Sequence, residues 1–344
     1  MTNPFTTTFG IEPSNYIARN VESERIVSEF SSDRPSNYVY IITGLRGSGK
    51  TVLLSAIANH FMKQDDWIVV DPGPKDNILE NVASELYETG KVKKLFLKGE
   101  FSFSFHGLTF SIEGKEPVTT ANTLLKKMLQ FLKKKGKKVL ITIDEVDNSE
   151  QMKLFIQAYQ SLLRLNYPVR LLMTGLYDNV SKLQEDKTLT FLYRAPKISL
   201  PPLGIGAVAS SYRRYLGISD EESIKMAKLT KGYAYAYQVL GYLLYPKSAK
   251  RIDGAVLAEY DQYLADYVYD KLYSELSDVE QRILRVFPSD GPIKMSDIAT
   301  ACALDTKYIS VYRDRLIKKG IVFSSSYGHL ELSLPRFYEY LLVK

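Results

Sequence analysis

Residues 38–51 read YVYIITGLRGSGKT, a β-branched and aromatic run that leads into a glycine-rich loop. From Gly44 to Thr51 the loop fits the pattern G-x-x-x-x-G-K-[ST] at every fixed position. The apolar spacing from Thr51 to Met62 is that of a helix, so the loop lies between a strand and a helix. In that context the backbone N–H groups of the loop turn inward around a phosphate. The stretch therefore predicts a nucleotide-binding site; the alternative is a glycine-rich turn without a ligand.

Two side chains of this loop have a direct chemical role. The Lys50 ammonium places positive charge at the β- and γ-phosphates, which makes it a candidate binding and catalytic residue. The Thr51 hydroxyl is a candidate Mg²⁺ ligand. We expect ATP and Mg²⁺ as ligands. The residues of this segment expected to contact the nucleotide are Gly44, Leu45, Arg46, Gly47, Ser48, Gly49, Lys50, Thr51 and Val52.

A second motif is the buried-strand run VLITIDE, residues 139–145, which ends in two adjacent carboxylates. Asp144 is expected to hold the Mg²⁺ ion, and Glu145 is placed to polarise the water that attacks the γ-phosphate. Adjacent Asp and Glu are typical of ATP-hydrolysing proteins, and the sequence has no N-K-x-D guanine motif. The pair therefore predicts hydrolysis of ATP rather than of GTP.

Two further residues are catalytic candidates. Thr174, at the end of the strand VRLLMT (169–174), is placed to sense the γ-phosphate or the attacking water. The alternative is that it caps the following helix. Arg194, in FLYRAPKISL, is a candidate for stabilising transition-state charge in its own or a neighbouring subunit; the alternative is a surface salt bridge.

Strands alternate with helices over the first two hundred residues. Besides the first strand, the candidates are WIVV (67–70), VLITI (139–143), VRLLMT (169–174) and KISL (197–200). This alternation predicts an α/β fold with a parallel sheet. The run FSFSFHGLTFSIEG (101–114) has period-two alternation on both sides of its His-Gly pair, which predicts an inserted hairpin.

The rest of the chain predicts two smaller parts. Residues 205–275 have helical spacing and are rich in tyrosine, which most simply covers a half-buried helical surface. At Ser277, S-D-V-E is a capping box, and helices are expected at 294–304 and 306–319, followed by two short strands. This order predicts a winged helix-turn-helix. The predicted domains are a core over 1–203, a helical lid over 204–276 and a winged helix over 277–344.

These motifs together resemble the AAA+/STAND division of P-loop ATPases, and within it the archaeal-type and origin-recognition-like ATPases that carry a C-terminal winged helix. One segment of this chain resembles an N-terminal motif of the family that would contact adenine. It consists of Tyr16, Ile17, Ala18 and Arg19 with Glu22 and Glu24, and Ala18 stands where the family has glycine. The lid motif G-x-P-x-A is similar to GYAYA (232–236), with Ala234 in place of the proline. No arginine occupies the lid sensor. The resemblance implies a sheet ordered 5-1-4-3-2, a helical lid, and a nucleotide at their junction.

The segment 306–319 is the most basic expected helix. It contains Lys307, Arg313, Arg315, Lys318 and Lys319 against one acid, Asp314. With Ile309, Tyr312 and Leu316 packed inward, a recognition-helix face remains free. Val311 and Asp314 on that face are poor contacts for a DNA groove, so protein docking is the alternative. The expected DNA contacts are Lys307, Tyr308, Ser310, Arg315, Lys318 and Lys319.

Composition sets outer limits. The chain has 344 residues with 45 basic and 39 acidic side chains, a net charge of +6 that is compatible with nucleic acid. One cysteine excludes an intramolecular disulfide, and no apolar run approaches a membrane span. With no secretion signal at its start, the chain is expected in the cytoplasm. We expect an ATPase that acts on duplex DNA, with a nucleotide-dependent homo-oligomer left open. The alternative is a STAND-like switch with slow or no turnover, whose winged helix docks a protein.

Overall fold

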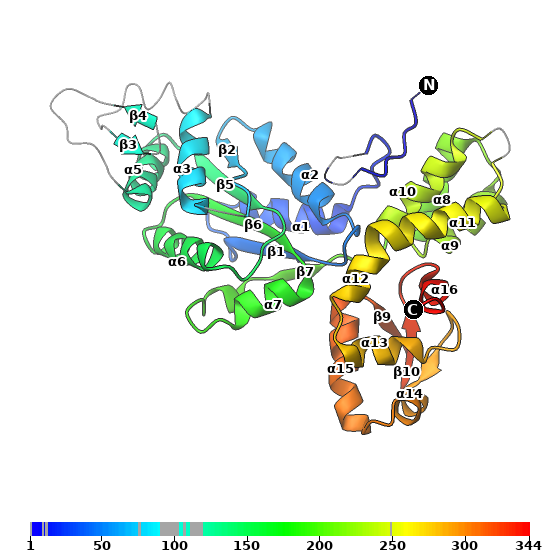
Figure 1. The fold of residues 1–344 in the computed structure, drawn as a ribbon. Coiled ribbons are helices and arrows are strands. Elements are labelled where there is room, and N and C mark those ends of the chain that lie inside the picture. Colours follow the sequence, from blue (N-terminus) through cyan, green and yellow to red (C-terminus); the bar gives the residue numbers. More distant parts are fainter. Residues whose placement is uncertain are drawn as a thin grey trace. The chain divides into compact units, whose positions relative to one another are not determined.

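The computed structural model describes residues 2–8, 10, 13–74, 77–89, 103–105, 108–110, 120–247 and 250–344. The chain divides into two compact units (Figure 1). The first, which we call the sheet unit, consists of Asn20–Thr43 and Lys50–Ser199. The second, the helical unit, consists of Met1–Arg19, Gly44–Gly49 and Leu200–Lys344.

The sheet unit is built on five parallel strands. They are β1 (Val39–Thr43), β2 (Trp67–Val70), β5 (Lys138–Ile143), β6 (Val169–Gly175) and β7 (Lys197–Ser199). Their order across the sheet is β2-β5-β6-β1-β7, which is 5-1-4-3-2 when these five strands are counted along the chain and the sheet is read from β7. Every residue of β1 and β6 is buried, as expected for parallel strands that are covered on both faces. The predicted fold class and strand order are confirmed.

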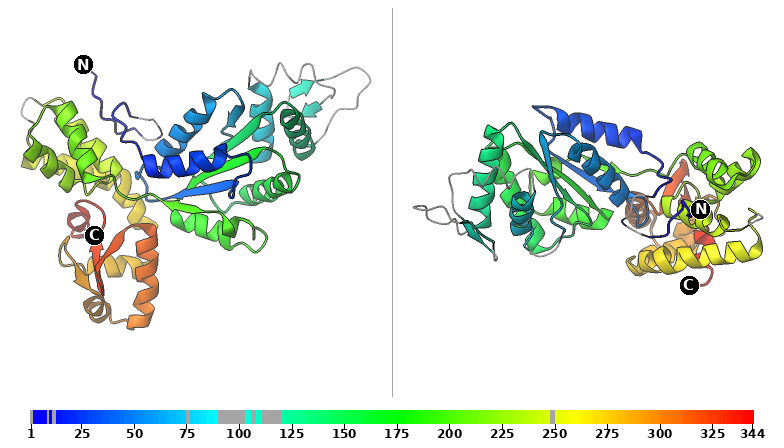
Figure 2. Two further views of the ribbon diagram at one scale, coloured as in Figure 1. Left: turned by 180° about the vertical axis from the view of Figure 1, so that it is seen from behind. Right: turned by 90° about the horizontal axis from the view of Figure 1, so that it is seen from above.

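Helices cover both faces of this sheet, as the views in Figure 2 show. Alternate strand residues such as Ile41 and Ile141 pack in one apolar cluster with residues of α3 (Ile78–Glu88), α5 (Ala121–Lys134), α6 (Glu150–Arg164) and α7 (Tyr177–Glu185). The opposite face carries α1 (Asn20–Ser31) and α2 (Lys50–Met62). There Phe30 of α1 meets Tyr40 edge-on at 5.6 Å between ring centroids. The result is a three-layer arrangement of helices, sheet and helices.

The predicted hairpin is also present. Strand β3 (Phe103–Phe105) pairs antiparallel with β4 (Leu108–Phe110), with Phe103 opposite Phe110. The His106–Gly107 pair that was expected to form its turn lies outside the described residues.

The helical unit begins its long run of helices at residue 205. They are α8 (Ile205–Leu216), α9 (Asp220–Leu229), α10 (Ala234–Leu244), α11 (Gly254–Leu264), a π-helical stretch (Ala265–Tyr269) and α12 (Asp270–Ser274). Tyrosines from these helices are more deeply buried than we expected from the sequence, since Tyr212, Tyr237 and Tyr260 have no measurable or almost no exposure. Hydrogen bonds make part of this burial possible; Tyr212 donates to the Tyr237 carbonyl at 2.8 Å.

The last part of the helical unit contains helices and a small antiparallel sheet. Its helices are α13 (Asp278–Arg285), α14 (Met295–Ala301), α15 (Thr306–Lys319) and α16 (Phe337–Leu341). Its strands are β8 (Ile293–Lys294), β9 (Val322–Ser326) and β10 (His329–Leu332), in the order β8-β10-β9. The expected capping box forms, because the Ser277 and Glu280 side chains each bond to the other residue's backbone N–H. Helix α15 has the predicted bounds, whereas α14 ends three residues earlier than predicted.

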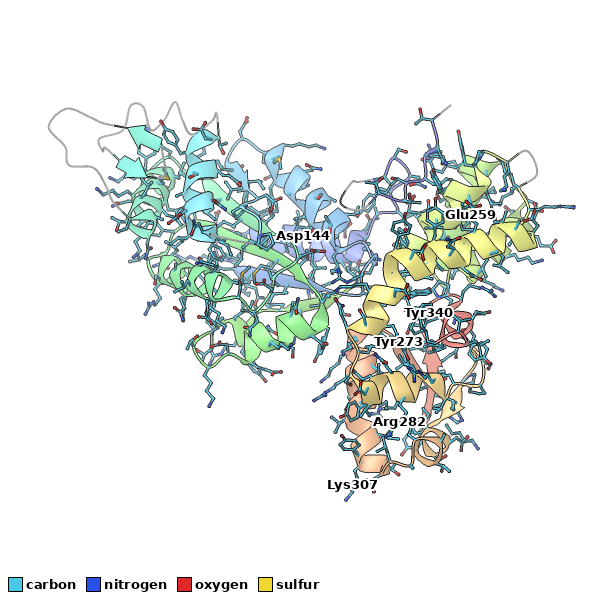
Figure 3. All side chains as sticks on the ribbon, in the orientation of Figure 1. Asp144, Glu259, Tyr273, Arg282, Lys307 and Tyr340 are labelled. Atoms are coloured by element: carbon cyan, nitrogen blue, oxygen red, sulfur yellow. The ribbon has the colours of Figure 1, made fainter. Side chains whose placement is uncertain are left out.

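One apolar core runs through the whole helical unit. The same buried cluster includes Tyr237 and Tyr260 from the helices after residue 205 and Ile283 and Leu316 from the C-terminal part. A bidentate ion pair also joins the two parts of this unit. The Arg336 guanidinium donates to both carboxylate oxygens of Asp261, at 2.8 and 2.6 Å. Figure 3 shows Tyr273 and Tyr340 beside each other, with ring centroids 6.0 Å apart. The proposed boundary at residue 277 thus crosses a shared core, and it stays a prediction.

Candidate nucleotide site

The predicted catalytic carboxylates lie where parallel strands end. Strands β5, β6 and β1 are neighbours, with Ile143 opposite Met173 and Gly175 opposite Thr43. Because parallel strands place their carboxyl ends at one edge of the sheet, the residues that follow β5 and β1 begin at the same edge. Asp144 follows β5 directly, and the glycine-rich loop follows β1.

Asp144 is held by two threonine hydroxyls. The Thr51 hydroxyl donates to Asp144 Oδ2 at 2.7 Å, and the Thr174 hydroxyl donates to Asp144 Oδ1. Thr174 is fully buried in β6, and its oxygen also accepts a hydrogen bond from the Glu145 amide at 3.1 Å. One hydroxyl therefore orients both residues of the acidic pair. Thr174 does not cap the next helix, because α7 begins at Tyr177 after Leu176.

Glu145 has an uncommon backbone conformation and an exposed side chain. Its φ is 55°, in the left-handed region where glutamate is rare. Two hydrogen bonds to Thr174 hold this turn. The Glu145 amide donates to the Thr174 hydroxyl, and the Val146 amide donates to the Thr174 carbonyl at 2.8 Å. A Cβ on Gly175 would come within 2.9 Å of the Val146 and Val180 side chains, so this position needs glycine. The turn thus points the Glu145 carboxylate toward solvent rather than into the core.

The glycine-rich loop combines left-handed glycines with a buried hydroxyl. Gly47 and Gly49 have φ values of 68° and 93°. Ser48 is 8% exposed, and its hydroxyl has no hydrogen-bond partner among the described residues. Lys50 is buried at the first residue of α2, where the helix places its positive end. A buried hydroxyl without a partner is costly, so a phosphate oxygen at this loop would satisfy it.

Arg19 contacts the loop itself. Its guanidinium donates to the Ser48 carbonyl at 2.9 Å and to the Pro201 carbonyl at 2.7 Å. The side chain is buried, and these two bonds hold it against the loop. Its expected contact with the nucleotide stays a prediction. Of the other residues in this N-terminal motif, Tyr16 and Ile17 are partly buried and Ala18 is exposed. Their expected contact with adenine stays a prediction.

Two side chains of the loop have partners within the helical unit. Arg46 pairs with Glu275 at 2.9 Å, and both side chains are about one third exposed. Leu45 packs against the apolar core of the helical unit. The expected contacts of these two residues with the nucleotide stay a prediction. Val52, in the first turn of α2, is half-buried.

Arg194 lies shortly before strand β7. It ends a 3₁₀ turn, Leu192–Arg194, and its side chain is exposed. In the described part of the chain, no ion pair or hydrogen bond joins its guanidinium to a carboxylate, so the salt-bridge alternative has no support. No such contact links it with Asp144 or Glu145 either.

Asp71 is a further acidic residue that the sequence motifs did not indicate, and it follows β2 at the same edge of the sheet as Asp144. Its amide donates to Glu85 Oε2 at 2.7 Å. Burial raises the pKa of the Asp71 carboxyl above its ordinary value, a hydrogen bond from Thr142 works against this, and the nearby Asp144 charge adds to it. An acid directly after the strand WIVV was the signal that could have found it. No group of three or more acidic, histidine or cysteine side chains in the described ranges is arranged to hold a metal.

The six expected DNA contacts all lie on α15, and they differ in exposure. Lys307, Tyr308, Arg315 and Lys318 are exposed, while Ile309 and Leu316 are buried as predicted. Figure 3 shows Lys307 at the outer end of this helix. Ser310 is partly buried, and its hydroxyl donates to the Thr306 carbonyl at 2.9 Å.

The prediction that Lys319 contacts DNA is wrong for this structure. Its side chain is only 12% exposed and pairs with the buried Glu280 at 2.8 Å. The reason is that Glu280, the last residue of the capping box, has a second carboxylate oxygen that needs a cation. Helical spacing gave no sign of this partner from another helix.

Comparisons with known proteins agree with this geometry. A family model described as an ATPase domain predominantly from Archaea matches residues 19–191, and a domain of unknown function, DUF8462, matches residues 266–341. Among curated proteins, no sequence matches the chain significantly. None of the helices in the described part of the chain has the length and hydropathy that crossing a bilayer needs.

Solved archaeal structures share the fold over nearly the whole chain. A Walker-type ATPase of Pyrococcus abyssi has a TM-score of 0.64 at 14% identity, covering 95% of this chain and 96% of that one. The ORC2 protein of Aeropyrum pernix, solved with ADPNP and ADP, has a TM-score of 0.60 at 14% identity, with coverages of 98% and 96%. Cdc6p of Pyrobaculum aerophilum has a TM-score of 0.51 at 12% identity, with coverages of 98% and 96%. Because this family model spans half of the chain, the protein belongs to the family of ATPase domains found predominantly in Archaea.

Proposed function

We propose that this ATPase binds ATP with Mg²⁺ on the loop Gly44–Thr51, hydrolyses it with Glu145 as the water-activating residue, and acts on duplex DNA through α15. The single observation that carries the proposal is the network in which Thr51 and Thr174 hold the Asp144 carboxylate, at 2.7 Å for Thr51. It joins a residue of the loop, a residue after β5 and a residue of β6 at one carboxylate. These are the parts that phosphoryl transfer needs in one place.

ATP is the substrate, and the loop recognises its phosphates. The N–H groups of the left-handed loop supply neutral donors, the Lys50 ammonium supplies charge, and the unpartnered Ser48 hydroxyl supplies a further donor. Helix α2 adds its positive end. This set of donors fits a polyphosphate better than a single carboxylate.

Mg²⁺ fits the two oxygen donors at the centre of the network. Thr51 Oγ1 and an Asp144 carboxylate oxygen are hard ligands of the kind that Mg²⁺ prefers. With no cluster of three such side chains in the described ranges, the other ligands would be phosphate oxygens and water. When bound, the ion neutralises charge on the phosphates.

Glu145 is the residue best placed to activate water. Its backbone is fixed by the Thr174 hydroxyl and its carboxylate is exposed beside Asp144. A carboxylate in that place can orient a water molecule and accept its proton as the water attacks the γ-phosphate. Thr174 would act through Asp144 and Glu145 rather than on the phosphate. The exposed Arg194 remains a candidate for contacting a nucleotide in a neighbouring subunit.

The proposed DNA contacts rest on the exposed cations of α15. Lys307, Arg315 and Lys318 are spaced along one helix of a segment whose helices and small sheet follow the order of a winged helix. Exposed cations on one helix attract phosphate whatever the DNA sequence.

A second candidate function is a switch that holds nucleotide and turns it over slowly. It is favoured by the residues at the start of α10, where Tyr233 and Tyr235 face the loop and no arginine is present. In this case the C-terminal segment would dock a protein.

Steady-state ATP hydrolysis with and without duplex DNA tests the proposal. We expect measurable turnover that DNA changes, and we expect Glu145→Gln to bind ATP normally while hydrolysing it about 10²- to 10⁴-fold more slowly. Unchanged turnover in Glu145→Gln would remove this residue from the mechanism. A wild-type protein that binds ATP but shows neither turnover nor a response to DNA would favour the switch.

A further inference from the structure

The start of α10 meets the glycine-rich loop through two hydrogen bonds. The Tyr233 hydroxyl donates to the Arg46 carbonyl, and the Tyr235 amide donates to the Gly47 carbonyl at 3.0 Å. Tyr233 is the residue just before the helix, and Tyr235 lies in its first turn. All of these residues belong to the helical unit.

A third donor completes the pattern. Arg19 donates to the Ser48 carbonyl at 2.9 Å. Three consecutive carbonyls of the loop, those of Arg46, Gly47 and Ser48, therefore each accept a hydrogen bond from outside the loop. None of these donors is itself part of the phosphate-binding motif.

This pattern matters because a phosphate-binding loop has to separate its two kinds of backbone dipole. Its N–H groups must point at the anion, so its carbonyl oxygens must point elsewhere. A carbonyl that turns toward the phosphates repels them and leaves one N–H fewer to bind them. Donors that hold the carbonyls outward keep the N–H groups arranged for the anion before it arrives, which lowers the cost of binding.

From this arrangement we infer that Tyr233 is a positioning residue for ATP binding, acting through the Arg46 carbonyl and not by contact with the nucleotide. The inference rests on the proposed function of the loop. It also assigns a role to a place where the chain departs from the lid motif of its relatives. Ala234 stands where the motif has proline, and the residue before it connects the lid to the loop instead.

Burial makes the Tyr233 hydroxyl a permanent donor. The side chain is 5% exposed, and burial raises the pKa of its phenol far above the ordinary value. The fit is also close. A Cβ on Gly47 would lie 2.6 Å from the Tyr233 oxygen and 2.8 Å from the Tyr235 Cβ, so the two tyrosines leave no room for a side chain there.

Tyr233→Phe removes only this donor, and Tyr212→Phe is its matched control. Tyr212 is also a buried tyrosine of the helical unit, and its hydroxyl donates to the Tyr237 carbonyl at 2.8 Å, with no hydrogen bond to the loop. For each protein we would measure the ATP dissociation constant by calorimetry, kcat and KM, and the melting temperature.

We expect Tyr233→Phe to weaken ATP binding about five- to tenfold, the loss of one hydrogen bond, and to raise KM more than it lowers kcat. Tyr212→Phe should lose comparable thermal stability and keep its ATP affinity within about twofold. Equal ATP affinity of Tyr233→Phe and wild type, or equal weakening by both variants, would overturn the role of Tyr233. A wild-type protein that binds no ATP would instead overturn the nucleotide site, and with it this role.

Discussion

The acidic edge of the sheet and the exposed face of α15 are both proposed to meet phosphates, yet they are organised in opposite ways. At the edge, the Asp144 carboxylate is already fixed by Thr51 and Thr174. On α15, Lys307 and Lys318 project into solvent. The fixed carboxylate at the sheet edge can therefore select one ligand geometry, whereas the solvent-exposed cations of α15 supply only charge. Changes at the edge should act on geometry, and changes on α15 should act through salt-dependent attraction.

The largest effect is expected from Lys50→Ala. It replaces the buried ammonium of the loop with a methyl group at a site built for anionic charge. We expect ATP binding to weaken by about 100-fold or more, to the limit of detection by calorimetry. Micromolar affinity retained in this variant, with a melting temperature like that of wild type, would contradict the assignment of the loop.

A triple change of Lys307, Arg315 and Lys318 to alanine tests whether the exposed cations of α15 bind DNA. Fluorescence anisotropy with random-sequence duplex should show about 100-fold weaker binding at roughly 50 mM salt, with the slope of log K against log salt smaller by roughly three. ATP affinity should not change.

Lys319→Ala is the matched control for that face, because its ammonium pairs with Glu280. It should lower thermal stability and leave DNA affinity within about twofold. If the triple variant binds DNA as the wild type does, or if the wild type does not bind, the proposed DNA role of α15 is overturned and the protein-docking alternative is favoured.

Thr174→Val tests the hydrogen bonds that hold the acidic edge of the sheet, and we expect a smaller effect than in the preceding variants. Valine keeps the shape and removes the hydroxyl, so Asp144 and the Glu145 amide each lose a partner. We expect kcat to fall about tenfold with ATP affinity nearly unchanged. The control is Tyr159→Phe in the same unit, a fully buried side chain whose hydroxyl donates to the Tyr38 carbonyl at 3.0 Å, just before β1. Equal loss of turnover in both variants would mean that Thr174 acts only on stability.

The smallest effect concerns pH. Burial alone would raise the pKa of Glu280, but hydrogen bonds from Lys319 and Ser277 outweigh it and hold the pKa below its ordinary value. The pair therefore stabilises the fold above the ordinary carboxyl pKa of about 4.3, and this contribution is lost as the pH falls below it. From about pH 6 to about pH 3 the melting temperature of wild type should fall by roughly 2–4 °C more than that of Lys319→Met, with most of the difference arising below the ordinary carboxyl pKa. Parallel curves for the two proteins would rule out this contribution.

The sequence by itself determined the elements that depend on neighbouring residues. The glycine-rich loop between a strand and a helix, the strand directly before Asp144 and the bounds of α15 were all predicted correctly. Glycine spacing, apolar periodicity and capping residues act over a few positions, and so they can be read locally. The order of the sheet followed from the family resemblance that those motifs carry.

Only the tertiary structure decided which side chains meet. Thr174 bonds to Asp144 across 30 positions, Arg19 to Ser48 across 29, and Tyr233 to Arg46 across 187. Lys319 looked like a DNA contact until the fold placed Glu280 beside it. Such partners depend on how strands and helices pack in three dimensions. Periodicity shows which face of an element is buried, but it does not show what that face will meet.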